Sequence, residues 1–394
     1  TCGHLAASPP PHGRSMNPNL TQLIVCFEPM PEPRVEGRTT HRLIDILVLT
    51  ICAVVAGADD WEHVAMWGEE KIDWLRQFVK LDHGIPSHDT IGRVFSLLDA
   101  DCFQACFVRW VSATCTSLAG EVVAIDGKTM RGSQRRRLGK NAIHVVSAFA
   151  SGRGITLGQL STDTKSNEIT AIPKLLDMLD VSGSTVTIDA MGCQVGIAAK
   201  IVEKGAHYLL GLKGNQGKLA EQVEDFFDIA ERERYRNLDA VEDIVHDKGH
   251  GRVETRRCVA LPARHLENTD AWSGLGSMVM VESMRFIDGK ESCEKRYYIS
   301  SMAPDSRAIG AAIRAHWGVE NQLHWRLDVT FGEDACRVRV GNAAENFNVV
   351  RKIVMNLLKA DTSRKLTMAK KRQLAALNTN FLGDVLGLRS NSEF

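Results

Sequence analysis

Three acidic residues lie where this sequence could hold divalent metal ions. Asp126 follows the apolar run VVAI, and Asp189 follows the run TVTI. Glu320 lies in the segment 313–328 (IRAHWGVENQLHWRLD). Carboxylate oxygens are the ligands that Mg²⁺ prefers, and two ions about 3.5–4 Å apart can bind both the attacking and the leaving oxygen of a phosphoryl displacement. We therefore predict that these acids are catalytic and bind Mg²⁺ (or Mn²⁺), with two ions in the site.

Each of these acids also has a simpler interpretation. Asp126 precedes Gly127, and Asp-Gly is a common turn. Asp189 could cap the helix that follows it. Glu320 could lie on a helix at a polar interface between domains, with its charge paired. Two Asp residues that both follow apolar strands are harder to explain as turns, because ligand sites in α/β sheets favour strand ends.

Side chains around the acids could contact a nucleic acid. If 306–328 is one helix, residues three and four apart share a face, so His316, Glu320, His324 and Asp328 form one stripe. Trp317 and Trp325 on that helix could stack on an unpaired base, although packing is the alternative for at least one of them. We predict DNA contacts by Lys128, Arg131, Lys213, His316, Trp317, Asn321 and His324.

The charge of the chain is balanced, but its distribution is not. Lys plus Arg equal Asp plus Glu at 48 each, which by itself does not favour a nucleic-acid partner. The segments 128–140 and 351–372 are nevertheless rich in Lys and Arg. These segments could form a DNA-binding surface, or they could be ordinary solvated loop and helix surface.

The elements that must position these residues follow from hydrophobic periodicity. Apolar spacing predicts helices over 43–56 and 61–81, and another helix after Pro86-Ser87. The last two could form a helix-turn-helix, with an ordinary helical hairpin as the alternative. After Glu121 we predict strands at 122–125, 142–150, 155–160, 185–188 and 207–212, with helices at 169–179 and 196–204.

This order of strands and helices predicts the fold class. Three strands, a helix, a strand, a helix and a strand form the element order of a ribonuclease H-like core. We predict an α/β fold with a ribonuclease H-like mixed sheet and flanking helices, a β-rich insertion and a helical N-terminal domain. The predicted parts are a disordered extension (1–20), a helical and candidate DNA-binding domain (21–118), the first part of the catalytic core (119–230), the insertion (231–304), and the last part of the core with a basic helical C-terminus (305–394).

The cysteines and the apolar runs exclude other classes of protein. The ten cysteines form no Cys-x-x-Cys pair, so we expect neither a zinc site nor a disulfide framework. The longest apolar run, 43–58, is short for a membrane span. We also expect no signal peptide, because the first fifteen residues lack a basic segment followed by an apolar one.

Several motifs together resemble a known family. The segments AIDGKTMRGS, HVVSAFAS, KSNEITAIPKLL, TIDAMGCQ, LLGLKGNQ and HWGVENQLHWRLDVTFGEDACRVR resemble H-repeat-associated (ISAs-type) insertion-sequence transposases of the DDE superfamily. The resemblance covers roughly residues 20–380, with the motifs in order. It implies Mg²⁺-dependent strand cleavage and strand transfer, and it places the three family acids on Asp126, Asp189 and Glu320. It also implies double-stranded DNA partners (inverted-repeat ends and target DNA), a homodimer on DNA, and a bacterial cytoplasmic location near the nucleoid.

One motif departs from the broader superfamily. Its Y-x2-R-x3-E-x6-K pattern would place Tyr, Arg and Lys where this chain has Ile313, His316 and Leu327. The departure leaves open which cations hold the DNA. Two other functions remain as alternatives: a ribonuclease H-like nuclease without strand transfer, and a non-catalytic DNA-binding protein derived from a transposase.

Overall fold

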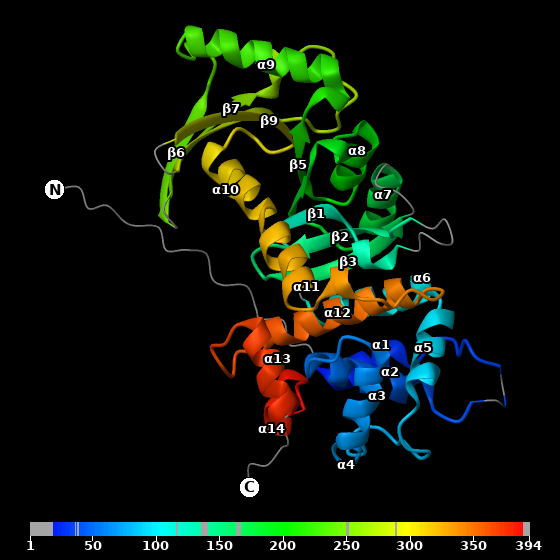
Figure 1. Cartoon of the computed structure of the whole chain (residues 1–394). Coiled ribbons are helices and arrows are strands. Elements are labelled where there is room, and N and C mark those ends of the chain that lie inside the picture. The colour runs from blue at the N-terminus through cyan, green and yellow to red at the C-terminus, as the bar shows by residue number, and fades with distance from the viewer. Residues whose placement is uncertain are drawn as a thin grey trace.

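The protein is a mixed α/β structure in which one long sheet is flanked by helices (Figure 1). This computed structural model describes residues 19–35, 37, 39–115, 117–134, 141–162, 167–249, 252–287 and 290–388. Residues 1–18 of the predicted extension, and the arginines of the segment 135–140, lie outside the described residues. Among the described helices, none combines the length and apolar character that crossing a bilayer requires.

The centre of the molecule is a five-stranded unit with the strand order β3-β2-β1-β4-β5. β2 is antiparallel to β1 and β3, whereas β4 is parallel to both β1 and β5. This is the predicted ribonuclease H-like arrangement, so the predicted fold class is confirmed. The strands are β1 (Val122–Thr129), β2 (His144–Ala150), β3 (Ile155–Thr162), β4 (Thr185–Ile188) and β5 (His207–Leu212), and the crossover helices are α7 (Glu168–Met178) and α8 (Val195–Glu203).

β1 is longer than its apolar residues predict. It continues past Ile125 to Thr129 because β2 pairs with it along this whole length, with Asp126 opposite Ser147. The prediction that Asp126 ends the strand is therefore wrong, and so is the alternative of an Asp-Gly turn. Cross-strand hydrogen bonds to β2 hold the polar half of β1 extended.

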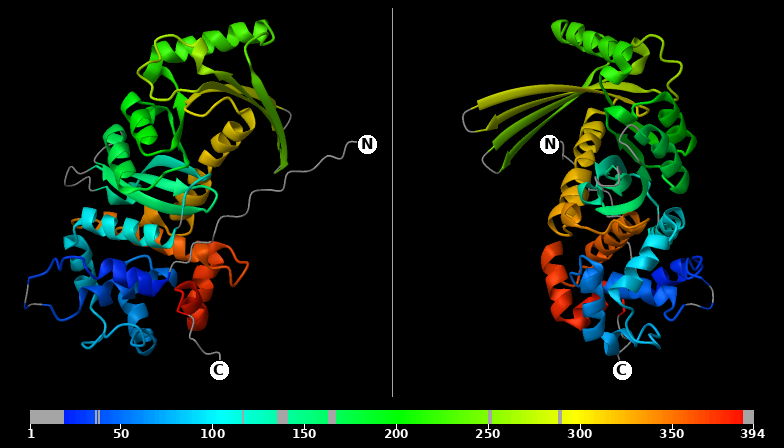
Figure 2. Two further views of the ribbon diagram at one scale, coloured as in Figure 1. Left: turned by 180° about the vertical axis from the view of Figure 1, so that it is seen from behind. Right: turned by 45° about the vertical axis from the view of Figure 1, so that its right-hand side comes forward.

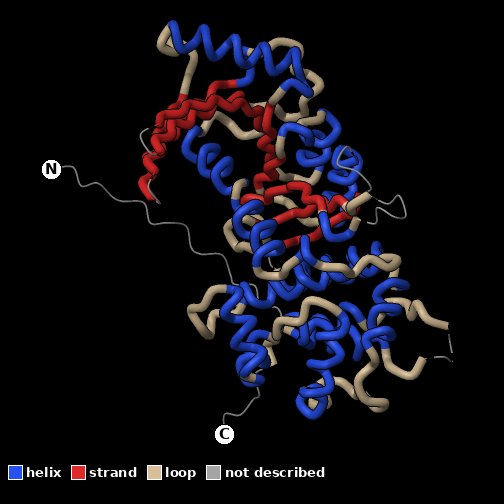
Figure 3. The backbone as a smooth tube through the Cα atoms, in the orientation of Figure 1, coloured by secondary structure: helices blue, strands red, loops and turns tan. Residues whose placement is uncertain are grey.

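The predicted β-rich insertion extends the central sheet. Its last strand, β9 (Lys290–Ser300), pairs antiparallel with β5, so that all the described strands form one nine-stranded sheet. Figure 2 shows the insertion strands projecting from the body as a curved arm, and Figure 3 shows the strands as one continuous band. The other elements of this part are α9 (Gly217–Arg232), β6 (Val241–Gly249), β7 (Arg252–Pro262) and β8 (Ser277–Ile287).

Helices before residue 115 pack beneath the sheet, around α12 (Ala343–Ala360) (Figure 1). The predicted helices at 43–56 and after Ser87 are present, and Ser87 caps its helix by accepting from Thr90 N. The single helix predicted over 61–81 is wrong, because the first helix ends at Glu70 and a separate short helix follows Lys71 and ends at Leu75. The helices are α1 (Leu20–Phe27), α2 (Leu43–Val55), α3 (Trp61–Glu70), α4 (Ile72–Leu75), α5 (His88–Leu97) and α6 (Ala100–Thr114).

Half of the predicted basic C-terminal surface is buried. Arg351 and Lys352 lie in α12 with 1% of their surface exposed, because this helix packs against both the N-terminal helices and β3. The Arg351 guanidinium lies 4.3 Å from the centre of the Phe347 ring. Lys371 and Arg372 are also buried and bind backbone carbonyl oxygens. All four cations are buried, so the expectation of a solvent-facing basic stretch fails for them. The remaining helices are α13 (Met368–Leu377) and α14 (Thr379–Val385). Lys371 and Arg372 join α13 to α12 and α2, whereas Lys352 donates to Ser147 of β2.

Candidate metal centre

Asp126 and Asp189 follow the last matched pair of two parallel strands. Ile125 of β1 is paired with Ile188 of β4, and each acid comes one residue later. Asp189 also starts a short 3₁₀ turn, where its carboxylate accepts a hydrogen bond from Met191 N at 3.0 Å. Asp189 therefore caps this short turn beside Asp126, not the predicted helix, which begins at Val195 after Gln194. The register of the sheet, rather than any local turn, brings the two acids to one edge.

Glu320 approaches this edge from a helix that is not continuous. α10 (Ser306–His316) packs along β1 and β4, a π-helical turn follows at Val319–His324, and α11 (Trp325–Val329) completes the segment. The single α-helix predicted over 306–328 is therefore wrong, because a π-helical turn interrupts it at Val319–His324. π-helical turns occur frequently at functional sites, and this one carries both Glu320 and His324.

The three predicted acids line one cavity of about 730 Å³. Within it, a tighter group forms: ligand atoms of Asp126, Glu320 and His324 all lie within 4.8 Å of one another. Nδ1 of His324 is 3.3 Å from Glu320 Oε2 and 3.6 Å from Asp126 Oδ2. Asp189 forms part of the same wall but lies outside this tighter group.

The electrostatics of the cavity favour a cation. Burial raises the pKa of Asp126 to about 6, and the nearby charges of Glu320 and Asp189 act in the same direction, whereas His324 opposes them. The hydrogen bond from His324 is the main cause that lowers the pKa of Glu320. Because several carboxylates share a partly buried space, a divalent ion would relieve their repulsion. The oxygen-rich donor set therefore fits Mg²⁺ or Mn²⁺.

Comparison with known proteins identifies the family. A family model described as "Transposase DDE domain" matches residues 117–357, which include all three acids. The chain belongs to the DDE transposase family. A second model, described as "DDE_Tnp_1-associated", matches residues 24–111, which hold the N-terminal helices of this DDE-family chain.

Relatives of this DDE-family chain are similar over almost their whole length. "Putative transposase YncI" of Escherichia coli O157:H7 is 42% identical over 95% of this chain and 97% of its own. "H repeat-associated putative transposase YhhI" of Escherichia coli (strain K12) is 42% identical over 93% of this chain and 98% of its own. Among solved structures, a piggyBac transposase synaptic complex with hairpin DNA matches at a TM-score of 0.42 and 11% identity, over 95% of this chain and 79% of that one.

Four of the predicted DNA contacts lie around the cavity that the three acids line in this DDE-family chain. Lys213, His316 and Trp317 line it, and Asn321 is exposed on the next turn. His316 is partly buried and its Nδ1 lies 2.9 Å from Thr187 Oγ1. Trp317 is 45% exposed, and the guanidinium of Arg296 lies 5.0 Å from its ring centre. Arg296 comes from the insertion, and the motifs of the sequence contain no signal for it.

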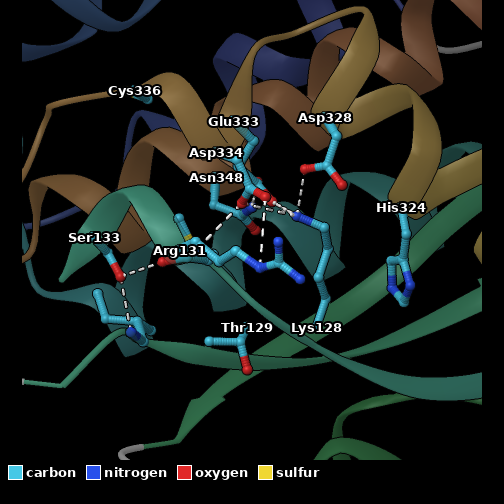
Figure 4. A network of polar contacts seen from close by, with 12 residues as sticks. Lys128, Thr129, Arg131, Ser133, His324, Asp328, Glu333, Asp334, Cys336 and Asn348 are labelled. Atoms are coloured by element: carbon cyan, nitrogen blue, oxygen red, sulfur yellow. Dashed lines mark hydrogen bonds and ion pairs between the residues drawn. The ribbon is translucent and has the colours of Figure 1, made fainter.

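Lys128 and Arg131 differ in their surroundings. Lys128 Nζ lies 2.6 Å from Glu333 Oε2, 2.7 Å from Asp328 Oδ1 and 3.7 Å from Asp334 Oδ1, with only 13% of the side chain exposed (Figure 4). Its ammonium is therefore held by carboxylates of this chain rather than directed at a phosphate. Arg131 is 84% exposed, with Nε 3.9 Å from Asp334 Oδ2.

His324 also differs from its predicted role as a DNA contact. Its side chain is 6% exposed, so it has little surface to offer DNA, and it lies against two of the three acids instead. The helical spacing of Glu320 and His324 predicted a shared face. Which strand that face meets could not be predicted, since the contact with Asp126 spans almost 200 positions of the chain.

A buried pair of titratable side chains lies behind β1. His144 is 2% exposed, with Nε2 2.6 Å from Glu168 Oε1 and Nδ1 2.9 Å from Thr129 Oγ1. A Cβ atom at Gly127 would overlap both His144 and Glu168. Gly127 thus allows this pair to lie directly against β1, on the face opposite to Asp126, since side chains alternate along a strand.

Proposed function

We propose that this chain is the transposase of a bacterial insertion sequence, which cuts and joins DNA with two divalent ions, Mg²⁺ or Mn²⁺, held by Asp126, Asp189 and Glu320. The observation that carries this proposal is that the three acids, from distant parts of the chain, line one cavity. Asp126 lies on the strand between β2 and β4, which suits an acid shared by both ions. When bound, such ions lower the pKa of a coordinated water and stabilise charge on the phosphate.

The proposed substrate is double-stranded DNA, as inverted-repeat ends and as target. Lys213 lines the cavity and Arg131 follows the strand of Asp126; both are exposed cations suited to backbone phosphates, which carry no sequence information themselves. Trp317 and Asn321 are exposed beside Glu320, where a base could stack or be hydrogen-bonded. We also propose that the helices of 21–118 bind DNA, that 119–230 with 305–394 form the catalytic part around the insertion 231–304, and that two copies act on paired ends.

The test is an assay of purified full-length chain on labelled DNA that carries the ends of its element. We expect Mg²⁺-dependent cleavage and strand-transfer products, both lost in Asp126→Asn and in Glu320→Gln. Glu203→Gln, an exposed acid on α8 with a side chain 69% exposed, is the matched control and should retain activity. Cleavage without strand transfer would indicate a nuclease, and unchanged activity in Asp126→Asn would refute the proposed site.

A further inference from the structure

The imidazole of His324 completes a compact set of metal-ligand atoms. Its Nδ1 lies 3.3 Å from Glu320 Oε2 and 3.6 Å from Asp126 Oδ2. Neighbouring ligands of an octahedral ion at 2.0–2.1 Å stand about 3 Å apart. The two separations from Nδ1 are therefore close to those between neighbouring ligands of such an ion, and all the ligand atoms of the group lie within 4.8 Å of one another.

The backbone holds His324 in this place. The π-helical turn that carries it is anchored by Val319 and Leu323, both fully buried. His324 is itself 5% exposed, so its ring has little freedom to turn toward solvent. Its Nδ1 faces the acids, and its other nitrogen, Nε2, is buried and makes no hydrogen bond to a described residue. A rigid, buried support of this kind is what a preorganised ligand requires.

We propose that His324 is a direct ligand, through Nδ1, of the ion held by Asp126 and Glu320. This inference rests on the proposed function, because it needs an ion in the cavity. Asp189, which lies outside the tight group, then serves the second ion together with Asp126. The two ions have different donor sets: one includes an imidazole nitrogen, and the other has carboxylate oxygens.

A nitrogen ligand changes which ion the site prefers. Mg²⁺ is a hard cation that selects oxygen, whereas imidazole suits first-row transition metals better. The His324 site should therefore prefer Mn²⁺ over Mg²⁺ more strongly than a site of carboxylates alone. The competing explanation is a plain pair between Glu320 and His324, four residues apart on one helical face, with no metal role.

Pulsed electron paramagnetic resonance on the Mn²⁺-loaded full chain separates these explanations, because it detects nitrogen bound to the ion without any measurement of activity. We expect ¹⁴N modulation in the wild type that changes to a ¹⁵N signal when histidine is ¹⁵N-labelled. His324→Gln should lose the signal and bind Mn²⁺ at least about tenfold more weakly. His316→Gln is the matched control, since His316 lines the same cavity outside the tight group, and it should keep the signal.

A second variant distinguishes the loss of a metal ligand from misfolding of the chain. His324→Asp supplies a carboxylate ligand in place of the imidazole, so it should bind Mn²⁺ better than His324→Gln, show no nitrogen signal and discriminate less between Mn²⁺ and Mg²⁺. A wild-type chain that binds Mn²⁺ through Asp126 but shows no ¹⁴N modulation would overturn the inference and leave the proposed function intact. Persistence of the modulation in His324→Gln would overturn it as well. If Mn²⁺ binding did not depend on Asp126 at all, both this inference and the proposed metal site would fail.

Discussion

Lys128 Nζ lies 2.6 Å from Glu333 Oε2, and this ion pair joins the strand of Asp126 to the segment that follows the Glu320 helix. The side chain of Glu333 is fully buried, whereas Lys128 is partly buried, with 13% of its side chain exposed. Burial alone would raise the pKa of Glu333, but the charges of Lys128 and Arg351, together with the hydrogen bond from Lys128, lower it overall. Asn348 of α12 donates a further hydrogen bond to Glu333. The pair therefore links β1, α12 and the end of the Glu320 segment behind the proposed metal site.

Removal of Lys128 should destabilise the protein strongly. Lys128→Ala leaves the buried Glu333 carboxylate without its nearest cation, and breaking one side of a buried pair costs about 3–5 kcal/mol. Denaturant unfolding measures this change. Lys213→Ala removes an exposed lysine and should change the free energy of unfolding by less than about 0.5 kcal/mol. A loss of similar size in the two variants would argue against the structural role of the Lys128–Glu333 pair.

Stability should rise with pH in a window set by Lys352. This lysine is buried against Ser147, and burial lowers its pKa from 10.5 to about 7. Between these two values the unfolded chain binds a proton that the folded chain does not, so the free energy of unfolding increases as pH rises from about 7 toward 10. Below pH 7 the full cost of burying the charged form is present.

Unfolding curves of wild type and Lys352→Met across this window check that effect. The variant should show a flatter dependence on pH, while Lys365→Met, which changes an exposed lysine, should follow the wild type. Parallel curves for wild type and Lys352→Met would show that Lys352 is not the group that titrates.

Asp126 should make the metal-free protein less stable at neutral pH. Its pKa is raised by burial from 3.8 to about 6, so the folded chain holds a proton that the unfolded chain has lost between these values. Stability of the metal-free protein therefore falls as pH rises from about 4 to 6. Asp126→Asn should remove this penalty and stabilise the metal-free protein at pH 7 by on the order of 1–2 kcal/mol, while activity is lost.

Thermal unfolding in the presence of a chelator measures the change, and added Mn²⁺ should stabilise the wild type far more than the variant. The affinity for Mn²⁺ should also weaken below about pH 6, since a proton then competes for the carboxylate. An Asp126→Asn chain that is less stable than wild type without metal would contradict this account.

Gly127 should not tolerate a side chain. The methyl group of Gly127→Ala would overlap Glu168 and His144, so either β1 or the buried pair must move. Overpacking of this kind costs about 1–3 kcal/mol, and the movement would displace the adjacent Asp126. Activity should fall together with thermal stability. Gly196→Ala on α8 meets no atom within 4 Å and should be neutral or slightly stabilising, because alanine favours helix.

Local sequence patterns determined much of the central sheet. β4 and β5 begin and end at the predicted residues, because Ser184 and Asp189 flank β4 while Gly205 and Lys213 lie just outside β5. Asp126 and Asp189 could be selected as candidates because each follows such a run. Ser87 could be predicted as a cap because its hydroxyl acts on the backbone three residues away.

Only the tertiary structure decided which distant groups meet. The joining of β9 to β5, the burial of Arg351 and Lys352, and the contact of Lys128 with Glu333 depend on packing between segments far apart in the chain. A lysine in a polar segment looks the same in sequence whether it faces a phosphate or a buried carboxylate. His324 is likewise a helical neighbour of Glu320 in the sequence, and only the approach of β1 places it against Asp126, because packing rather than local periodicity sets that contact.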